Sequence, residues 1–102
     1  MVGQELADLI TAKWTYPYDV QIKKVKDRIF FQVMWKFLGQ ASFPLSEEEY
    51  YEHLNGVCSY INAWGVESQI KEFIGATKEK PRLGKAVSLP LDLGEISSEW
   101  IL

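Results

Sequence analysis

The sequence contains few of the side chains that most often carry chemistry, with one cysteine, Cys58, and one histidine, His53, among 102 residues. A single cysteine excludes an internal disulfide. On one helix, side chains five residues apart point about 140° away from each other, which excludes a catalytic dyad between these two. Two potential ligands without suitable spacing do not make a zinc site. We therefore expect no catalytic residue, no metal and no cofactor, and we expect Cys58 to be a semi-buried small hydrophobe.

The sequence also lacks any stretch typical of a membrane span or a secretory signal. Its longest apolar runs, such as IFFQVMWKFL, are interrupted by Gln32 and Lys36 and are too short to cross a bilayer. The first residues, MVGQELADLI, do not show the basic region and long apolar stretch of a secretory signal. There is no internal repeat, low-complexity tract or linker. We expect one domain over residues 1–102, in a reducing compartment.

Apolar residues, by contrast, are abundant. They make up 47% of the chain and include four tryptophans, which excludes disorder as the global state. The net charge of −3 is unevenly spread, because residues 13–36 carry +4, residues 37–67 carry −5 and residues 71–85 carry +3. This alternation indicates a polarised surface rather than a general polyanion binder.

The hydrophobic pattern predicts an α+β fold, since helical and strand periodicities follow each other along the chain. It comprises an N-terminal helix, an antiparallel β-hairpin, two helices, and a C-terminal edge strand that completes a small sheet with helices on one face. The predicted elements are a helix over 3–14, strands over 18–25 and 29–37, helices over 46–64 and 66–76, a basic loop over 78–85, a strand over 86–91 and a tail over 95–102.

Local signals refine this prediction. Ser46 and Glu49 have the spacing of a capping box, which marks a helix start. The strand over 29–37 is apolar enough on both faces to be central, and Trp35 and Trp64 are expected in the core. Pro90 has no N–H to donate, so the strand over 86–91 is expected at an edge of the sheet, paired with the central strand.

Two long stretches, QVMWKFLGQASFPLSEEEY and KPRLGKAVSLPLDLG, together with the closing SEWIL, resemble a small cyanobacterial and plastid family of uncharacterised proteins, domain of unknown function 3067. The resemblance covers nearly the whole chain. It implies an oxygenic phototroph and a soluble location, either the cyanobacterial cytoplasm or the plastid stroma. It implies no activity, cofactor or catalytic residue, so no site residue is carried over from it.

A cluster of positive charges is the sharpest candidate for a binding site. Gly84 lies among these charges and lets a ligand approach the backbone closely. The hairpin adds cations that could join the loop in one basic face. The alternative interpretation is a solvated loop whose charges keep an edge strand from aggregating. The candidate residues for binding a partner or an anion are Lys78, Lys80, Arg82, Lys85, Lys24 and Arg28.

The sequence therefore favours a non-enzymatic protein-interaction, assembly or regulatory factor. The partner would be another protein, bound by strand addition at 86–91 and steered by the basic loop. The alternative is a binder of an anionic ligand or nucleic acid, although a pI near 5.1 argues against a general nucleic-acid role. We expect the four loop cations to be exposed and largely unpaired, Pro90 to turn its nitrogen toward solvent, and Leu89 with Val87 or Leu91 to point into the core.

Overall fold

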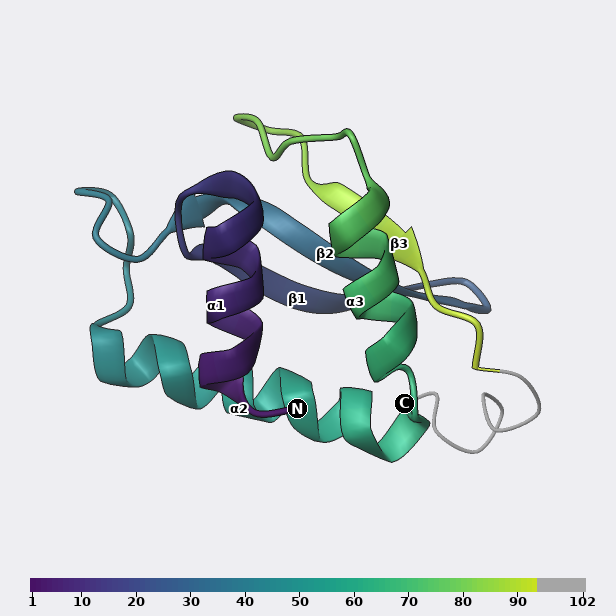
Figure 1. Cartoon of the computed structure of the whole chain (residues 1–102). Helices are drawn as coiled ribbons and strands as arrows, with labels where there is room; N and C mark the ends of the chain where they lie inside the picture. Colours follow the sequence, from purple (N-terminus) through teal and green to yellow (C-terminus); the bar gives the residue numbers. More distant parts are fainter. Residues whose placement is uncertain (94–102) are drawn as a thin grey trace.

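The fold is the predicted α+β arrangement. The computed structural model describes residues 1–93, and the predicted tail over 95–102 lies outside them. Figure 1 shows the chain passing from a helix through a hairpin and two more helices to a last strand. The elements are α1 (Gly3–Trp14), β1 (Tyr18–Val25), β2 (Arg28–Phe37), α2 (Glu47–Trp64), α3 (Glu67–Ala76) and β3 (Val87–Pro90).

The three strands form one antiparallel sheet in the order β1-β2-β3, which confirms β2 as the central strand and β3 as an edge. Val33 in β2 lies opposite Val20 on one side and Val87 on the other. The hairpin turn falls at Lys26 and Asp27, as predicted, and Lys26 adopts a positive φ of 55° to make it. Strand β3 is two residues shorter than the predicted strand.

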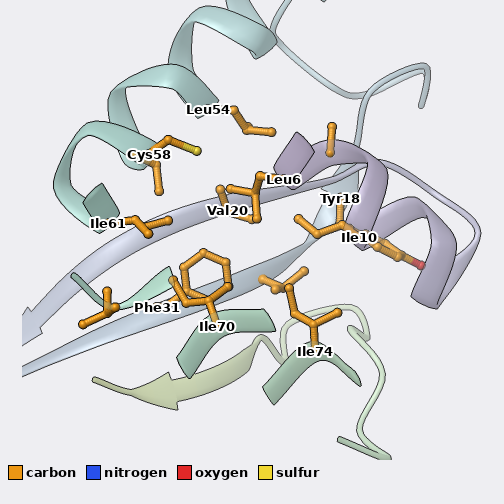
Figure 2. Packing of buried hydrophobic residues seen from close by; sticks show 14 of the residues in the cluster. Leu6, Ile10, Tyr18, Val20, Phe31, Leu54, Cys58, Ile61, Ile70 and Ile74 are labelled. Atoms are coloured by element: carbon orange, nitrogen blue, oxygen red, sulfur yellow. The ribbon is translucent and has the colours of Figure 1, made fainter. Parts of the chain in front are cut away.

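The helices cover one face and one edge of the sheet. In Figure 1, α1 and α3 stand in front of the sheet, and α2 runs across below them. Helix α2 packs against α1 and β1. Figure 2 shows Leu6, Ile10 and Ile70 reaching from the helices toward Val20 and Phe31 of the sheet. The core is therefore the layer between the helices and one face of the sheet.

One core prediction is correct and one is wrong. Trp64 is buried, as predicted, whereas Trp35 is only half-buried and lies outside the core cluster. The reason is a register irregularity, since Tyr18 pairs with Phe37 while Val20 already pairs with Val33. Residues 34–36 thus lie opposite the single residue 19, and the regular alternation that predicted an inward Trp35 is interrupted there.

The ends of α2 follow the sequence signals. Ser46 Oγ accepts a hydrogen bond from the Glu49 amide, and the Glu49 carboxylate accepts one from the Ser46 amide, which completes the predicted capping box. These bonds to Ser46 lower the pKa of the Glu49 carboxyl. At the other end, Gly65 has a φ of 67° and closes the helix, as expected.

The opposite face of the sheet carries a polar row that crosses all three strands. Gln21 Nε2 donates to Gln32 Oε1 at 2.6 Å, and Gln32 Nε2 donates to Ser88 Oγ at 2.9 Å. These three residues are also direct partners in the strand register. The row therefore links β1, β2 and β3 by side chains as well as by backbone.

None of the helices within residues 1–93 combines the length and apolar character that a membrane span requires.

Candidate functional site

The basic segment after α3 forms a tight turn. The Arg82 amide donates to the Lys85 carbonyl at 3.0 Å, and the Lys85 amide donates to the Arg82 carbonyl at 2.7 Å. Gly84 has a φ of 77° while Leu83 keeps a negative φ, which fits a type II turn with glycine at its third position. The turn thus projects from the body of the protein, as the loop between α3 and β3 at the top of Figure 1 shows.

The base of this turn is anchored to the helices. Trp14 of α1 donates its indole N–H to the Glu79 carbonyl at 3.0 Å. The Glu79 amide in turn donates to the Thr77 hydroxyl, and Pro81 is buried. These contacts hold the residues that lead into the turn, so the turn is positioned before any partner arrives.

The tip of the turn exposes a large apolar side chain. Leu83 is 90% exposed, far more than any other large apolar residue among those described. It lies directly between Arg82 and Gly84 in a turn whose backbone is already hydrogen-bonded. Burying a leucine on binding contributes about 1.5–3 kcal/mol of hydrophobic free energy, so the tip is suited to insertion into an apolar pocket.

The four cations of the segment lie around a hollow beside this turn. Lys78, Lys80, Arg82 and Lys85 are all exposed, as predicted, and none forms an ion pair with another residue of 1–93. Together with Glu79 and the buried Val87, they line a hollow of about 230 Å³. The site therefore combines an exposed apolar tip with positive charge that has no partner within the described chain.

The other two candidate residues lie elsewhere. Lys24 and Arg28 belong to the hairpin end of the sheet, beside the turn at residues 26–27, and both are exposed. The basic turn instead precedes β3, whose first residue pairs with Val33. At about 3.3 Å per residue, the five positions from Arg28 to Val33 separate the two groups by roughly 17 Å. The structure therefore does not join them in a single basic face.

The β3 edge offers little backbone to an added strand. Leu91 donates its N–H to the Ile29 carbonyl. Because backbone groups alternate in direction along an antiparallel strand, those of Ser88 and Pro90 point away from β2. Pro90 is exposed and has no N–H, which confirms the predicted orientation. Val87 is buried and Leu89 and Leu91 pack partly against the core, also as predicted. Ser88 is thus the one β3 residue with both an amide and a carbonyl at this edge.

His53 and Cys58 do not meet. His53 Nε2 donates to the Val20 carbonyl at 2.7 Å and lies 3.4 Å from the Asp19 carboxylate. Desolvation raises the pKa of Asp19, and its electrostatic interaction with His53 opposes this shift. Cys58 is buried in the core rather than semi-buried, and burial raises the pKa of its thiol. Within residues 1–93 no cluster of three or more acidic, histidine or cysteine side chains could hold a metal ion.

Sequence reasoning missed two parts of this site. It assigned no role to Leu83. In the motif RLGK this leucine precedes the glycine of a turn and stands between two cations, a pattern that indicates an exposed position. It also gave Trp14 no function beyond the first helix, because its hydrogen bond joins residues 65 positions apart. The first could have been found from the motif RLGK, whereas the second has no local signal.

Comparisons with known proteins agree with the fold. The family described as domain of unknown function (DUF3067) matches residues 4–101. The solution NMR structure of the Alr2454 protein from Nostoc sp. strain PCC 7120 is 60% identical to this chain, with a TM-score of 0.89, and covers 100% of this chain and 98% of that one. No curated protein matches the chain significantly.

Proposed function

Since the chain belongs to the DUF3067 family, which carries no assigned activity in its description, we propose from the site itself that this protein is a protein-interaction factor. It acts by binding rather than by catalysis, as an assembly or regulatory factor of an oxygenic phototroph. The basic turn is its contact surface. The cyanobacterial relative supports the phototroph origin, and we propose the cytoplasm or, in a plastid, the stroma as its location.

The observation that carries this proposal is Leu83 at the tip of an anchored turn. An exposed leucine buries little apolar surface against residues 1–93, while the backbone of the turn is already constrained by two hydrogen bonds and by Gly84. Binding through a preorganised turn loses little conformational entropy. A central apolar anchor surrounded by polar contacts is also the usual arrangement of binding energy in an interface.

The charges specify the chemistry of the partner. Arg82 and Lys85 flank the tip, and Lys78 and Lys80 line the hollow beside it, so a complementary surface has a small apolar pocket with an acidic rim. Strand addition at β3 adds little to this contact, because Pro90 leaves Ser88 as the main available backbone at that edge. The turn, rather than the strand, is therefore the principal contact.

Site-specific photo-cross-linking in cyanobacterial cells tests this proposal. A benzoylphenylalanine residue replaces Leu83 in one variant, and replaces Thr11, which is exposed on α1, in a control. We expect a discrete cross-linked protein from position 83 and not from position 11. Adding Arg82→Glu and Lys85→Glu should abolish the cross-link, whereas Lys23→Glu and Lys26→Glu at the other end of the sheet should preserve it.

Identical cross-links from both positions, or a position-83 cross-link that survives the Arg82→Glu and Lys85→Glu changes, would contradict the proposal.

The hollow beneath the four cations favours one alternative, an anionic ligand or nucleic acid. A single-stranded oligonucleotide that makes roughly four phosphate contacts there should bind with a log–log salt slope of about −3. Such a slope, lost in the Arg82→Glu, Lys85→Glu variant, would replace protein binding by anion binding as the function of the turn.

A further inference from the structure

Strand β1 has a free edge that α2 covers only in its first half. Val25 and Arg28 flank the two-residue hairpin turn. The backbone N–H and C=O groups of odd-numbered β1 residues therefore point toward β2, and those of even-numbered residues point outward from the sheet edge. The Tyr50 hydroxyl donates to the Tyr18 carbonyl at 3.0 Å, and His53 Nε2 donates to the Val20 carbonyl at 2.7 Å. Side chains of α2 thus occupy the outward carbonyls of the first two positions.

The cover ends after His53. The next outward residue is Ile22, and no side chain of the described residues bonds to its backbone groups at this edge. A groove of about 380 Å³ opens there between β1 and α2. It is lined by Gln21, Ile22, His53, Gly56, Val57 and Tyr60.

Gly56 supplies the second observation. It lies inside an 18-residue helix, where glycine destabilises relative to alanine. A Cβ placed on it would meet no atom within 4 Å, so no contact within the described chain requires glycine here. The missing side chain instead widens the groove beside the exposed Tyr60. A glycine that costs helix stability and leaves open space next to an uncovered strand edge indicates room for another backbone.

The charges at this edge identify what fits. Side chains of an added strand alternate between the two faces of the sheet. On the helix side they would meet apolar Ile22 and Val57, and on the open face they would lie beside Lys23. Lys26 and Arg28 extend the positive charge at the adjoining hairpin end, and both are exposed.

We propose that the uncovered part of the β1 edge and the β1–α2 groove bind an extended segment of a partner protein in which apolar and acidic residues alternate. The segment adds as a strand beside Ile22, its apolar side chains enter the groove over Gly56, and its acidic side chains pair with Lys23 and its neighbours. This site goes beyond the proposed function, because it lies at the opposite end of the sheet from the basic turn and rests on different residues.

A second copy of the chain fits this edge poorly. Symmetric pairing of the part of β1 beyond Val20 would bring Lys23 and Lys24 of one copy against the same residues of the other. Like charges directly opposite each other destabilise a strand pair. An acidic segment has no such penalty.

A labelled eight-residue peptide of alternating valine and glutamate is the probe, with binding to the full chain followed by fluorescence polarisation. We expect saturable binding that weakens at least tenfold in the Gly56→Leu variant, because the leucine side chain fills the groove. Leucine is a good helix former and the position is open, so this variant should fold. Gly75→Leu, the same change at an open position of α3, should bind as the unaltered protein does.

N-methylated peptides distinguish strand addition from simple apolar contact. In a strand, alternate amides face β1, so methylation of one set should abolish binding and methylation of the other set should leave it unchanged. A peptide with lysine in place of glutamate should bind at least tenfold more weakly, and Arg82→Glu with Lys85→Glu should have no effect.

Several results would overturn the proposal: no binding, equal binding of both N-methylated sets, or unchanged affinity in Gly56→Leu. So would light scattering that shows a dimer lost in Gly56→Leu, which would make a second copy the occupant. Binding that occurs only after removal of residues 94–102 would assign the groove to the chain's own last segment. Because the basic turn enters these measurements only as a control, their failure leaves the proposed function standing.

Discussion

The two edges of the sheet are protected in opposite ways. Strand β1 has eight residues, and side chains of α2 cover the first half of its edge. Strand β3 has four residues and no such cover from residues 1–93, but it ends at Pro90 and follows an exposed basic turn. A long edge requires a covering element, whereas a short edge that ends in proline presents too little backbone to attract another strand. The places where protection stops, at Ile22 and at Leu83, are the places where we propose binding.

The largest expected effect comes from a residue that serves both edges. Phe31 is fully buried in β2 and lies opposite Ile22 on one side and Leu89 on the other. Replacing it with alanine should lower the free energy of unfolding by about 3–5 kcal/mol, because it removes a large core side chain. Chemical denaturation measures this loss. A cost below about 1 kcal/mol would show that the two edges do not depend on a shared core.

The cover of β1 should matter next. Tyr50→Phe removes the donor to the Tyr18 carbonyl while it keeps the buried ring, and should cost about 1–3 kcal/mol. Tyr51→Phe, at a neighbouring half-buried tyrosine, is the matched control and should change stability by less than about 0.5 kcal/mol. Equal effects of the two substitutions would mean that the hydroxyl of Tyr50 does not stabilise the edge.

The same hydroxyl predicts a pH dependence. Burial raises the pKa of Tyr50 above its ordinary value of 10.0. Its contribution is therefore fully present below pH 10 and is lost as the pH rises further, because the unfolded chain releases this proton first. Thermal unfolding between pH 8 and 11 should show a steeper decline for the unaltered protein than for Tyr50→Phe. Parallel curves would contradict this assignment.

A smaller effect of opposite sign is expected in the groove. Gly56→Ala should stabilise the protein by about 0.5–1 kcal/mol, since alanine favours the helix interior and its Cβ meets open space. Gly65→Ala should destabilise it instead, because Gly65 has a φ of 67°. Thermal unfolding of the two variants compares them directly. A loss of stability in Gly56→Ala would show that the groove is not open.

The smallest effect is expected at the basic turn. Arg82→Glu together with Lys85→Glu should change the free energy of unfolding by less than about 0.5 kcal/mol, because both side chains are exposed and have no ion-pair partner among residues 1–93. Chemical denaturation of this variant supplies the measurement. A cost above about 1 kcal/mol would mean that these charges serve the fold, and the contrast between a structural β1 edge and a binding turn would disappear.

Most of the fold could be predicted because its signals are local. The Ser46–Glu49 capping box, the stop at Gly65 and the turn at residues 26–27 all depend on neighbours in sequence. Trp35 was misplaced because strand alternation assumes a regular register, and the irregularity opposite residue 19 has no signature in β2 itself.

The candidate site was predicted only in part. The exposure of the four cations followed from charge alone, since unpaired buried charges are too costly. The cover of β1 could not be predicted, because Tyr50 and His53 bond to backbone more than thirty residues away. Periodicity places such residues on a helix face but does not say which strand edge that face meets.

The polar row Gln21–Gln32–Ser88 has one further consequence, for the uniqueness of the strand alignment. A shift of β3 by two residues along β2 would keep every apolar side chain on its own face, so hydrophobicity alone distinguishes it weakly. That shift would place Pro90 opposite Gln32 in place of Ser88. Proline cannot accept the hydrogen bond that Gln32 now donates to the serine hydroxyl. The row therefore favours one strand register among those that the apolar pattern alone would permit.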